Sequence, residues 1–305
     1  MPASPSHGFA LSPRQLLLLA ALTLVWGLNW PVMKAAIGGF PPLSFRTLSM
    51  WLGLPVLYAA TVALKLPLRI ERRDWRELGV LTFTNMIVWY VLAIVALQAL
   101  PSGRAAILGY TMPIFSAVIG MALFGQRLSA RQWAGVAAAA LGVALLLWHE
   151  LGRMAGKPWA ALGMLVSAAV WALGTQQLRR TRIAAPTLAL VFWMTLLTTL
   201  VMSALAIVLE HDRWVALPAA TWFGVVYNAL LIIGFAQPLW LVLARNLPPI
   251  ASTLSVMLIP VLGTASGAWW LAERLHWQDF AAMLLMLAAI ASVLLPTRTT
   301  PSPGR

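Results

Sequence analysis

Long apolar runs, separated by short polar segments, make up most of the chain. Within each run the apolar positions are continuous and do not alternate, which is typical of helices and not of barrel strands. A membrane-spanning helix needs about 20 mostly apolar residues. The runs lie at about residues 15–37, 42–64, 77–98, 102–124, 131–149, 158–178, 186–209, 219–243, 248–272 and 278–296. The pattern therefore predicts an all-α membrane protein with ten transmembrane helices.

The composition agrees with a membrane protein and not with a soluble one. Hydrophobic residues make up 61% of the chain and charged residues only 10%, whereas roughly a quarter of the residues in soluble domains are charged. The absence of cysteine excludes disulfides, thiolate metal sites and cysteine nucleophiles. The four histidines form no pair on one helix face, so we predict no metal and no cofactor.

The formal net charge of +13 indicates membrane topology and not nucleic-acid binding, because the basic residues are spread through short connections. Cytoplasmic segments of membrane proteins are enriched in Lys and Arg. With the N-terminus in the cytoplasm, 14 of the 21 Lys and Arg residues fall on the cytoplasmic side, most densely at residues 65–76 and 179–182. We therefore predict a multi-pass protein of the inner (plasma) membrane with both termini cytoplasmic. The first run is too long for a signal peptide and is predicted to be retained.

A sequence repeat relates the two halves of the chain. A shift of 147 residues places Leu100-Pro101 on Leu247-Pro248, Pro113 on Pro260, Gly120 on Gly267 and Gln126-Arg127-Leu128 on Glu273-Arg274-Leu275. Each copy holds five spans, and an odd number requires the second copy to enter the membrane from the opposite side. The predicted organisation is a tail (1–14), a first five-helix repeat (15–149), a connection (150–157), a second repeat (158–296) and a tail (297–305).

Several motifs occur in a specific order along residues 15–296. They are residues 25–34 (VWGLNWPVMK), 41–46 (PPLSFR), 96–100 (ALQAL) followed by 112–114 (MPI), 125–129 (GQRLS) and 272–275 (AERL). Together they resemble the drug/metabolite transporter superfamily, specifically its ten-span EamA-type permeases. Gln126 replaces the glutamate of the family's Gly-Glu-Arg-Leu signature, whereas the second half keeps the acid as Glu273. The resemblance implies two inverted repeats around a central cavity and the export of amino acids or other small metabolites.

The carboxylates indicate how transport is driven. A buried acid in the middle of a span is the usual proton-coupling group in membrane transporters. All eight carboxylates lie in connections or close to a span end: Glu71, Asp74, Glu77, Glu150, Glu210, Asp212, Glu273 and Asp279. This placement favours a facilitative carrier, or coupling through groups at span ends. The alternative is that Glu273 or Glu77 dips inward and couples protons.

Neutral polar and aromatic residues within the spans are the candidate substrate-binding groups. Amides that face lipid are costly, so most should face the interior, where they bind either solute or neighbouring helices. An aromatic wall with a few amides suits a small amphipathic or aromatic solute. The candidates are Trp26, Asn29, Asn85, Trp89, Tyr90, Tyr110, Trp171, Thr175, Asn228 and Gln237. Tryptophans near span ends, Trp30 among them, are expected in the interfacial belt.

Proline and charge supply the remaining candidates. Pro113 and Pro260 lie at matching positions in the two halves, where proline removes a backbone hydrogen bond and kinks a helix. Such paired interruptions are predicted hinges near a transport site, with a static packing kink as the alternative. Charged candidates for a gate or substrate clamp are Lys34, Arg46, Arg104 and Glu273. The alternative interpretation of the three basic residues is that their side chains extend to the membrane interface.

The sequence therefore predicts a secondary transporter that exports small metabolites, either amino acids or aromatic and amphipathic solutes, by alternating access. The alternatives are a multidrug or other metabolite permease coupled to protons, and a non-transporting membrane subunit. An enzyme is not expected, because no catalytic set lies within the spans. No phosphate-binding loop motif occurs, so ATP is not the energy source. The expected partners are a small-molecule substrate and the lipid bilayer, and the expected state is a monomer or weak dimer.

Overall fold

The computed structural model describes residues 13–152, 157–246 and 249–294, and helices dominate these ranges. Within them, the side chains of 14–16, 149–152, 243–246, 249–257 and 293–294 are not described. The predicted tail at 297–305, nearly all of the tail at 1–14 and half of the connection at 150–157 lie outside this description. No strand occurs in the described ranges.

The helices fall into two groups at the middle of the chain. The first half contains α1 (Pro13–Ala36), α2 (Pro42–Ala63), η1 (Arg72–Asp74), α3 (Trp75–Thr82), η2 (Phe83–Ile87), α4 (Val88–Ala99), α5 (Ser102–Gly109), α6 (Met112–Phe124) and α7 (Ala130–Gly152). The second half contains α8 (Pro158–Leu178), α9 (Thr187–Glu210), η3 (His211–Arg213), α10 (Ala219–Tyr227), η4 (Asn228–Ala236), α11 (Gln237–Asn246), α12 (Pro249–Leu271) and α13 (Trp277–Leu294).

Many of these helices are long and apolar enough to cross a membrane. In the described ranges seven stretches meet both conditions: Leu17–Ala36, Arg72–Ala99, Ser102–Phe124, Ala130–Trp148, Pro158–Leu178, Thr187–Arg213 and Ala219–Val242. Two shorter apolar helices, Leu258–Leu271 and Trp277–Ser292, follow them. The chain is therefore an all-helical, multi-span membrane protein.

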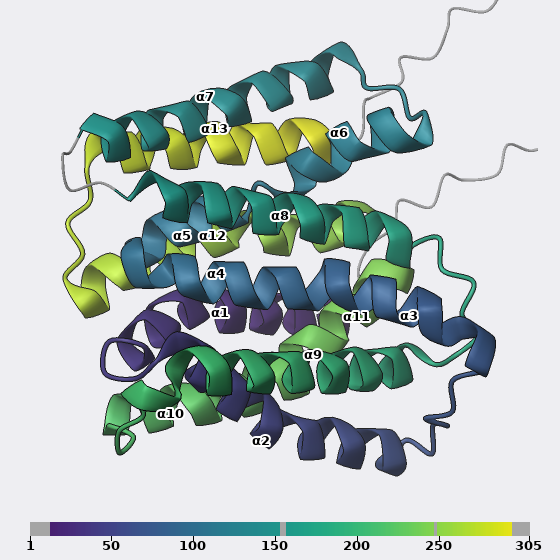
Figure 1. Cartoon of the computed structure of the whole chain (residues 1–305). Helices are drawn as coiled ribbons and strands as arrows, with labels where there is room; N and C mark the ends of the chain where they lie inside the picture. The colour runs from purple at the N-terminus through teal and green to yellow at the C-terminus, as the bar shows by residue number, and fades with distance from the viewer. Residues whose placement is uncertain (1–12, 153–156, 247–248, 295–305) are drawn as a thin grey trace, which may run out of the picture.

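The long helices run roughly parallel and the chain passes back and forth along them (Figure 1). The connections after α2, α6 and α8 lie at one end, on the right in Figure 1, and this is the basic end, formed by residues 64–74, 125–129 and 179–186. The connections at residues 37–41, 100–101, 211–218 and 272–276 lie at the other end. This is the capped end, because Glu210 and Glu273 there cap helix N-termini.

Helix packing repeats between the two halves. The pair of α1 with α12 has its counterpart in α8 with α6, and η2 with α8 has its counterpart in η4 with α1. Two further pairs, α2 with α9 and α7 with α13, join like elements of the two halves. The α7 and α13 pair lies along one side of the bundle (Figure 1). Gly142 allows this close approach, because a side chain there would press on the Ala282 carbonyl of α13.

The two turns that the sequence repeat aligns have the same backbone geometry. Gly125 follows α6 with a φ of 65°, and Ala272 follows α12 with a φ of 51°. The next residue donates its N–H back across six residues in both turns, Gln126 to the Gly120 carbonyl at 3.1 Å and Glu273 to the Gly267 carbonyl at 3.4 Å. A left-handed residue commonly ends a helix, and glycine adopts it without strain. Ala272 adopts it although it carries a side chain, which is uncommon.

Both halves also carry a π-helical stretch in their third long helix. It spans η2 between α3 and α4 in the first half and η4 between α10 and α11 in the second. The shift of 147 residues moves η2 to positions inside η4. π-helical turns are rare and occur frequently at functional sites.

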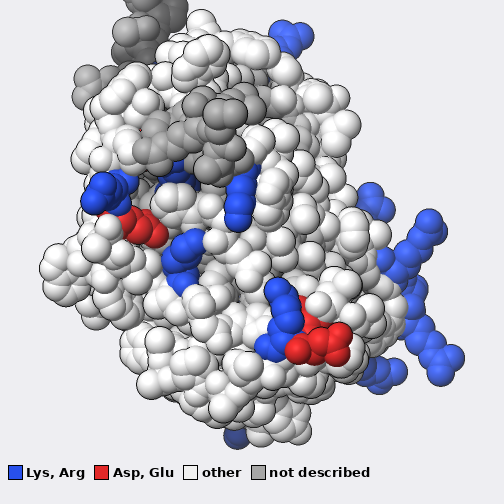
Figure 2. Space-filling model, turned by 60° about the vertical axis from the view of Figure 1, so that its left-hand side comes forward, with Lys and Arg blue, Asp and Glu red and all other residues white. Residues whose placement is uncertain are grey.

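The outer surface is mainly apolar, as a lipid-facing surface requires. Figure 2 shows a face that is mostly uncharged, on which Lys and Arg are more evident than Asp and Glu. Tryptophans near helix ends are exposed, and they include Trp133, Trp148, Trp159 and Trp277. Trp30, which the sequence placed in this interfacial group, is instead 4% exposed and packs inside the bundle.

Candidate functional site

A cavity of about 290 Å³ lies between the two halves. This volume is near the lower limit for small-molecule pockets, which is about 300 Å³. Both halves contribute to its wall: α1, α2, α4, α6 and the α6–α7 turn from the first half, with α8, η4 and α11 from the second. Most of the wall is aromatic or apolar, with a few amides, hydroxyls and guanidinium groups, which is the usual composition of a binding site for an organic solute.

Aromatic rings form one connected chain along the cavity. Trp171 and Trp240, both from the second half, stack with their ring centroids 6.0 Å apart and an interplanar angle of 21°. From this pair the contacts continue to Trp26 on one side, and to Trp89, Trp30 and Tyr110 on the other, with centroid distances of 5.5–6.5 Å. Such pairs add stability beyond the burial of their area. This series of rings includes residues of both halves, so a bound solute would contact rings from both.

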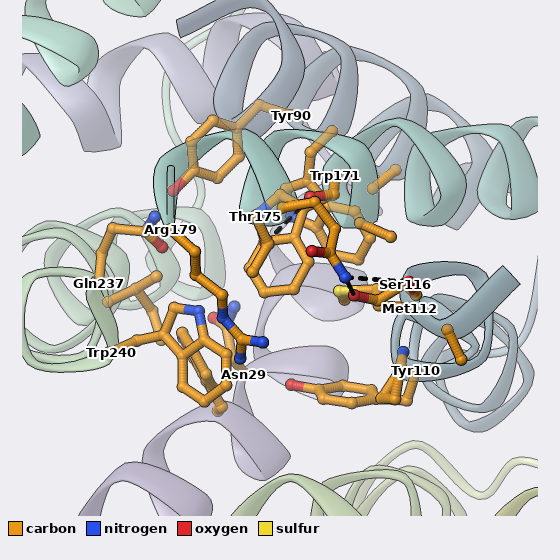
Figure 3. Close-up of a pocket in the computed structure, with 18 of the residues that line it drawn as sticks. Asn29, Tyr90, Tyr110, Met112, Ser116, Trp171, Thr175, Arg179, Gln237 and Trp240 are labelled. Carbon is orange, nitrogen blue, oxygen red and sulfur yellow. Dashed lines mark hydrogen bonds between the residues drawn. The ribbon is translucent and has the colours of Figure 1, made fainter. Parts of the chain in front are cut away.

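Amides and hydroxyls interrupt the aromatic wall. Gln176 on α8 donates to the carbonyl and the hydroxyl of Ser116 on α6 at 3.0 and 2.8 Å, which links the two halves. Thr175 donates to the Trp171 carbonyl at 3.0 Å. Asn29 is buried and its Oδ1 has no hydrogen-bond partner in the described structure. Figure 3 shows Asn29, Ser116 and Thr175 around the same space, into which Tyr110 and Arg179 also point.

Arg46 on α2 brings a buried positive charge to the cavity wall. Its side chain is 4% exposed. Nη1 donates to Asn228 Oδ1 at 2.9 Å, Nη2 contacts Met33 Sδ at 2.7 Å, and the guanidinium carbon lies 4.9 Å from the ring centroid of Tyr90. Asn228 is itself held by a 3.0 Å bond to the Gly224 carbonyl. Among the side chains that the structure describes, no carboxylate forms an ion pair with Arg46.

The cavity reaches the surface at the basic end. Exposed residues line it there, namely Gln126, Arg127 and Arg179. Partial burial, with Arg180 beside it, lowers the pKa of the Arg179 guanidinium from its ordinary value. Arginine nevertheless stays protonated in proteins, so the mouth remains positively charged.

At the capped end, two glutamates of the second half bind helix N-termini of the first half. Glu273 accepts hydrogen bonds from the Ser102 N–H at 2.7 Å and the Ser102 hydroxyl at 2.9 Å, at the start of α5. Glu210 accepts from the Ser44 N–H and hydroxyl, both at 2.7 Å, at the start of α2. Anions at a helix N-terminus satisfy free N–H groups and interact favourably with the helix dipole. These contacts tie the halves together at this end.

Two further charged contacts close the same end. Arg104 Nε lies 2.6 Å from Asp279 Oδ1, and the two side chains are only 6% and 3% exposed. Lys34 donates to the carbonyls of Leu97 and Gln98 at 2.8 and 2.9 Å. None of the connections that form the capped end contributes a described residue to the cavity wall. The cavity is thus open at the basic end and separated from the capped end.

The structure brings most of the sequence candidates to one place. Ten of them line the cavity: Trp26, Asn29, Arg46, Trp89, Tyr90, Tyr110, Pro113, Trp171, Thr175 and Gln237. Six do not line it: Lys34, Asn85, Arg104, Asn228, Pro260 and Glu273. Of these, Asn228 still touches the site through Arg46. Asn85 bonds to the Leu81 carbonyl within its own helix and packs against Gly174 of α8, which matches the helix-packing interpretation.

The two candidate hinges differ in their surroundings. Pro113 is the second residue of α6 and follows a break in the helix at Tyr110 and Thr111. Pro260 lies inside the continuous helix α12. An interruption at this pair of positions therefore occurs only in the first half.

Several lining residues were not among the sequence candidates: Trp30, Met33, Ser116, Gln126, Gln132, Arg127 and Arg179. A signal for Trp30 was available, because it follows Trp26 by four residues and so shares its helix face. The same spacing places Met33 on the face of Asn29. Nothing in the local sequence of Arg179 distinguishes it from the other exposed arginines of the basic end.

Comparison with known proteins agrees with this architecture. The EamA-like transporter family matches residues 14–148 and 158–295. The chain therefore belongs to the EamA-like transporter family, a class of membrane transporters, as the motifs predicted. A solved crystal structure with 22% sequence identity has the same fold, with a TM-score of 0.71 over 95% of this chain and 99% of the other.

The curated relatives are bacterial transporters. The uncharacterized inner membrane transporter YedA of Escherichia coli (strain K12) is 26% identical over 93% of this chain and 94% of its own length. The probable amino-acid metabolite efflux pump of the same organism is 25% identical, over 92% of this chain and 94% of its own length. The uncharacterized transporter YoaV of Bacillus subtilis (strain 168) is 22% identical over 89% and 94%.

Proposed function

We propose that this protein is a secondary transporter that exports small amphipathic metabolites, such as amino acids, by alternating access. The observation that carries the proposal is the cavity itself, which is lined by both halves, open at the basic end and separated from the capped end by contacts between the halves. Rocking one half against the other would break the capped-end contacts and expose the same cavity on the other side. The names of relatives that export amino acids or their metabolites support this substrate class.

We propose ten spans arranged as two inverted five-helix repeats. The mirrored packing of α1 with α12 and of α8 with α6 supports this layout, as do the matching turns at Gly125 and Ala272. The two turns lie at opposite ends of the bundle, as inversion requires (Figure 1). A cavity enclosed by one chain is compatible with a monomer, or with a weak dimer of independent units.

We further propose that the basic end faces the cytoplasm, in keeping with the enrichment of Lys and Arg in cytoplasmic segments. In this orientation the structure is open to the cytoplasm, which is the state in which an exporter loads its solute. Both termini then lie in the cytoplasm. The inner membrane is the proposed location, because a relative that matches along nearly its whole length is named for it.

Coupling to protons through an acid in the middle of a span is not part of the proposal. Glu210 and Asp279 are buried, but each lies at a helix end and is fully engaged by hydrogen-bond donors. The described carboxylates do not line the cavity. A carrier driven by the solute gradient fits these observations, and coupling through Glu273 at the capped end is the alternative.

The test is solute flux into liposomes that contain the purified protein, with and without a pH gradient, across a panel of amino acids and aromatic metabolites. We expect saturable flux of at least one aromatic amino acid. Trp171→Ala, which removes a stacked ring from the cavity, should reduce flux about three- to tenfold. Trp222→Ala, on the exposed surface, is the matched control and should leave flux unchanged.

Two outcomes would contradict the proposal. Absence of flux for the whole panel would favour a non-transporting membrane subunit. Flux that appears only with a pH gradient would instead favour the proton-coupled alternative.

A further inference from the structure

We propose that Arg46 binds the carboxylate of the solute and makes the transporter selective for zwitterions and anions over cations. This inference rests on the proposed transport function and adds a substrate class to it. It also distinguishes the protein from a permease for cationic drugs.

The first reason is the charge of Arg46 within the protein. A guanidinium buried away from water needs compensation, and an isolated buried charge is costly. Here the described partners are an amide oxygen of Asn228, the thioether of Met33 and the face of Tyr90. None of these groups carries a negative charge. A carboxylate that enters the cavity would supply the missing one.

The second reason is the set of donors that Arg46 still offers. A guanidinium has five N–H donors, and in Arg46 the two Nη nitrogens contact Asn228 Oδ1 and Met33 Sδ. Arg46 Nε is buried and has no partner. Thioether sulfur is a weak acceptor and methionine is a flexible side chain. A carboxylate oxygen would therefore displace Met33 at small cost and gain a charge-assisted bond, which is stronger than the one it replaces.

The third reason is an unused acceptor close by on α1. Asn29 lines the cavity, and its buried Oδ1 has no hydrogen-bond partner. Asn29 lies four residues before Met33, so the two share a helix face about one turn apart. Met33 in turn contacts Arg46. A solute with a carboxylate and a neighbouring amino group would place its anion at Arg46 and an N–H donor at Asn29.

The charge of the whole cavity points the same way. Arg46, Arg127 and Arg179 line it, and no Asp or Glu does so in the part of the chain that the structure describes. Clefts lined by one sign of charge concentrate ligands of the opposite sign. Cations would meet three guanidinium groups with no compensating carboxylate, so both attraction and repulsion contribute to the selectivity.

A purely structural interpretation of Arg46 makes a different prediction. If Arg46 only ties α2 to η4 through Asn228, then Asn228→Ala and Arg46→Gln should have the same effect. A carboxylate site instead depends on the charge of Arg46 and not on the bond to Asn228. The ratio of affinities for a carboxylate and for its amide separates the two interpretations.

The experiment measures binding to the purified protein by quenching of its tryptophan fluorescence, because five tryptophans line the cavity. The probes are L-phenylalanine and 3-phenylpropionate, each compared with its amide. We expect wild type to bind both carboxylates about tenfold or more tightly than their amides. Arg46→Gln should abolish this preference, Arg46→Lys should restore part of it, and Asn228→Ala should retain it.

Asn29→Leu tests the second contact. It should weaken binding of L-phenylalanine about five- to tenfold and leave 3-phenylpropionate, which has no amino group, unchanged. Equal affinity of wild type for acids and amides, or binding of neither acid, would overturn the inference. So would a loss of preference in Asn228→Ala equal to that in Arg46→Gln.

The same probes in the liposome assay keep this inference separate from the transport proposal. Arg46-dependent binding without flux would support the carboxylate site and contradict the proposed transport function. Equal flux of acids and amides would support the transport function and contradict the carboxylate site.

Discussion

The two ends of the bundle contain the same helix-ending turn with different side chains. At the basic end the turn after α6 carries Gln126, which is exposed and lines the cavity mouth. At the capped end the equivalent turn after α12 carries Glu273, which binds the N-terminus of α5. Backbone geometry is shared, with a left-handed residue and an N–H bond across six residues in both turns. The difference therefore lies in the side chain and in what it can bind.

The comparison indicates why this structure is open at one end only. A carboxylate at a helix N-terminus forms charge-assisted bonds and interacts with the helix dipole, whereas an amide forms only neutral ones. The capped end has Glu273, Glu210 and the Arg104–Asp279 pair, all of which join the two halves. We infer that replacing the glutamate of the family motif by Gln126 weakens closure at the basic end and shifts the resting population toward opening there.

The largest expected effect comes from breaking the ion pair of the capped end. Asp279→Asn removes the charge of Asp279 from the buried Arg104, and removal of one member of a buried pair costs about 3–5 kcal/mol. We expect a clear fall in the thermal unfolding midpoint of the protein in detergent. The double variant Arg104→Met/Asp279→Leu removes both charges and should recover most of this stability. An unchanged midpoint for Asp279→Asn would show that the pair does not hold the end together.

The next effect comes from making the two turns alike. Glu273→Gln replaces a charged cap by a neutral one, so the capped end should open more often. Because the chain has no cysteine, Ala93→Cys in the cavity wall reports this opening through labelling by an impermeant maleimide added outside the cell. We expect labelling to become about tenfold faster.

Glu71→Gln is the matched control for this experiment. It removes an exposed carboxylate that pairs with Arg73 at the basic end, and such surface pairs contribute little. Labelling in this variant should equal that of the parent. If Glu273→Gln also matches the parent, the cap does not control access.

The smallest effect comes from the reverse change. Gln126→Glu gives the basic end the acid that the other turn has, so that end should close more often. Labelling of Ala93→Cys from the cytoplasmic side, in inverted vesicles, should slow about two- to threefold, a difference of roughly 0.5 kcal/mol. Gln132→Glu adds the same charge to the cavity mouth outside the turn, and should not slow labelling. Equal slowing in both variants would assign the effect to charge alone.

The repeat and the aromatic positions could be predicted from the sequence because both follow from local patterns. The 147-residue register located the matching turns, and their positions within the spans made Trp26 and Trp171 candidates, both of which line the cavity. The positions and binding partners of the charged residues could not be predicted in this way. Lys34 and Arg46 both lie near the first connection of the capped end, yet Lys34 binds backbone carbonyls and Arg46 enters the cavity wall. Their partners lie far away in the chain, on α4 and at the start of η4, and only tertiary packing selects them.

Asn85 and Asn228 illustrate the same limit. Both were candidates because they lie in corresponding spans, but only Asn228 reaches the site, through Arg46. The register shift places Asn85 opposite Ile232 and Asn228 opposite Leu81, so the repeat does not pair the two amides. Correspondence of spans was therefore insufficient, and the face of each residue decided the outcome.

The π-helical stretches explain why residues in corresponding spans can lie on different helix faces. A π-turn holds its hydrogen bonds across five residues instead of four, so the residues beyond it are displaced around the helix axis by about one position, or roughly 100°. The stretch at η2 therefore sets the phase of α4 separately from that of α3. The face of α3 that packs on α9 and the face of α4 that carries Trp89 and Tyr90 are therefore rotated relative to each other around the helix axis. One continuous span can thus pack on α9 with its first part and line the cavity with its second part. Its apolar residues therefore do not form a single stripe along its length.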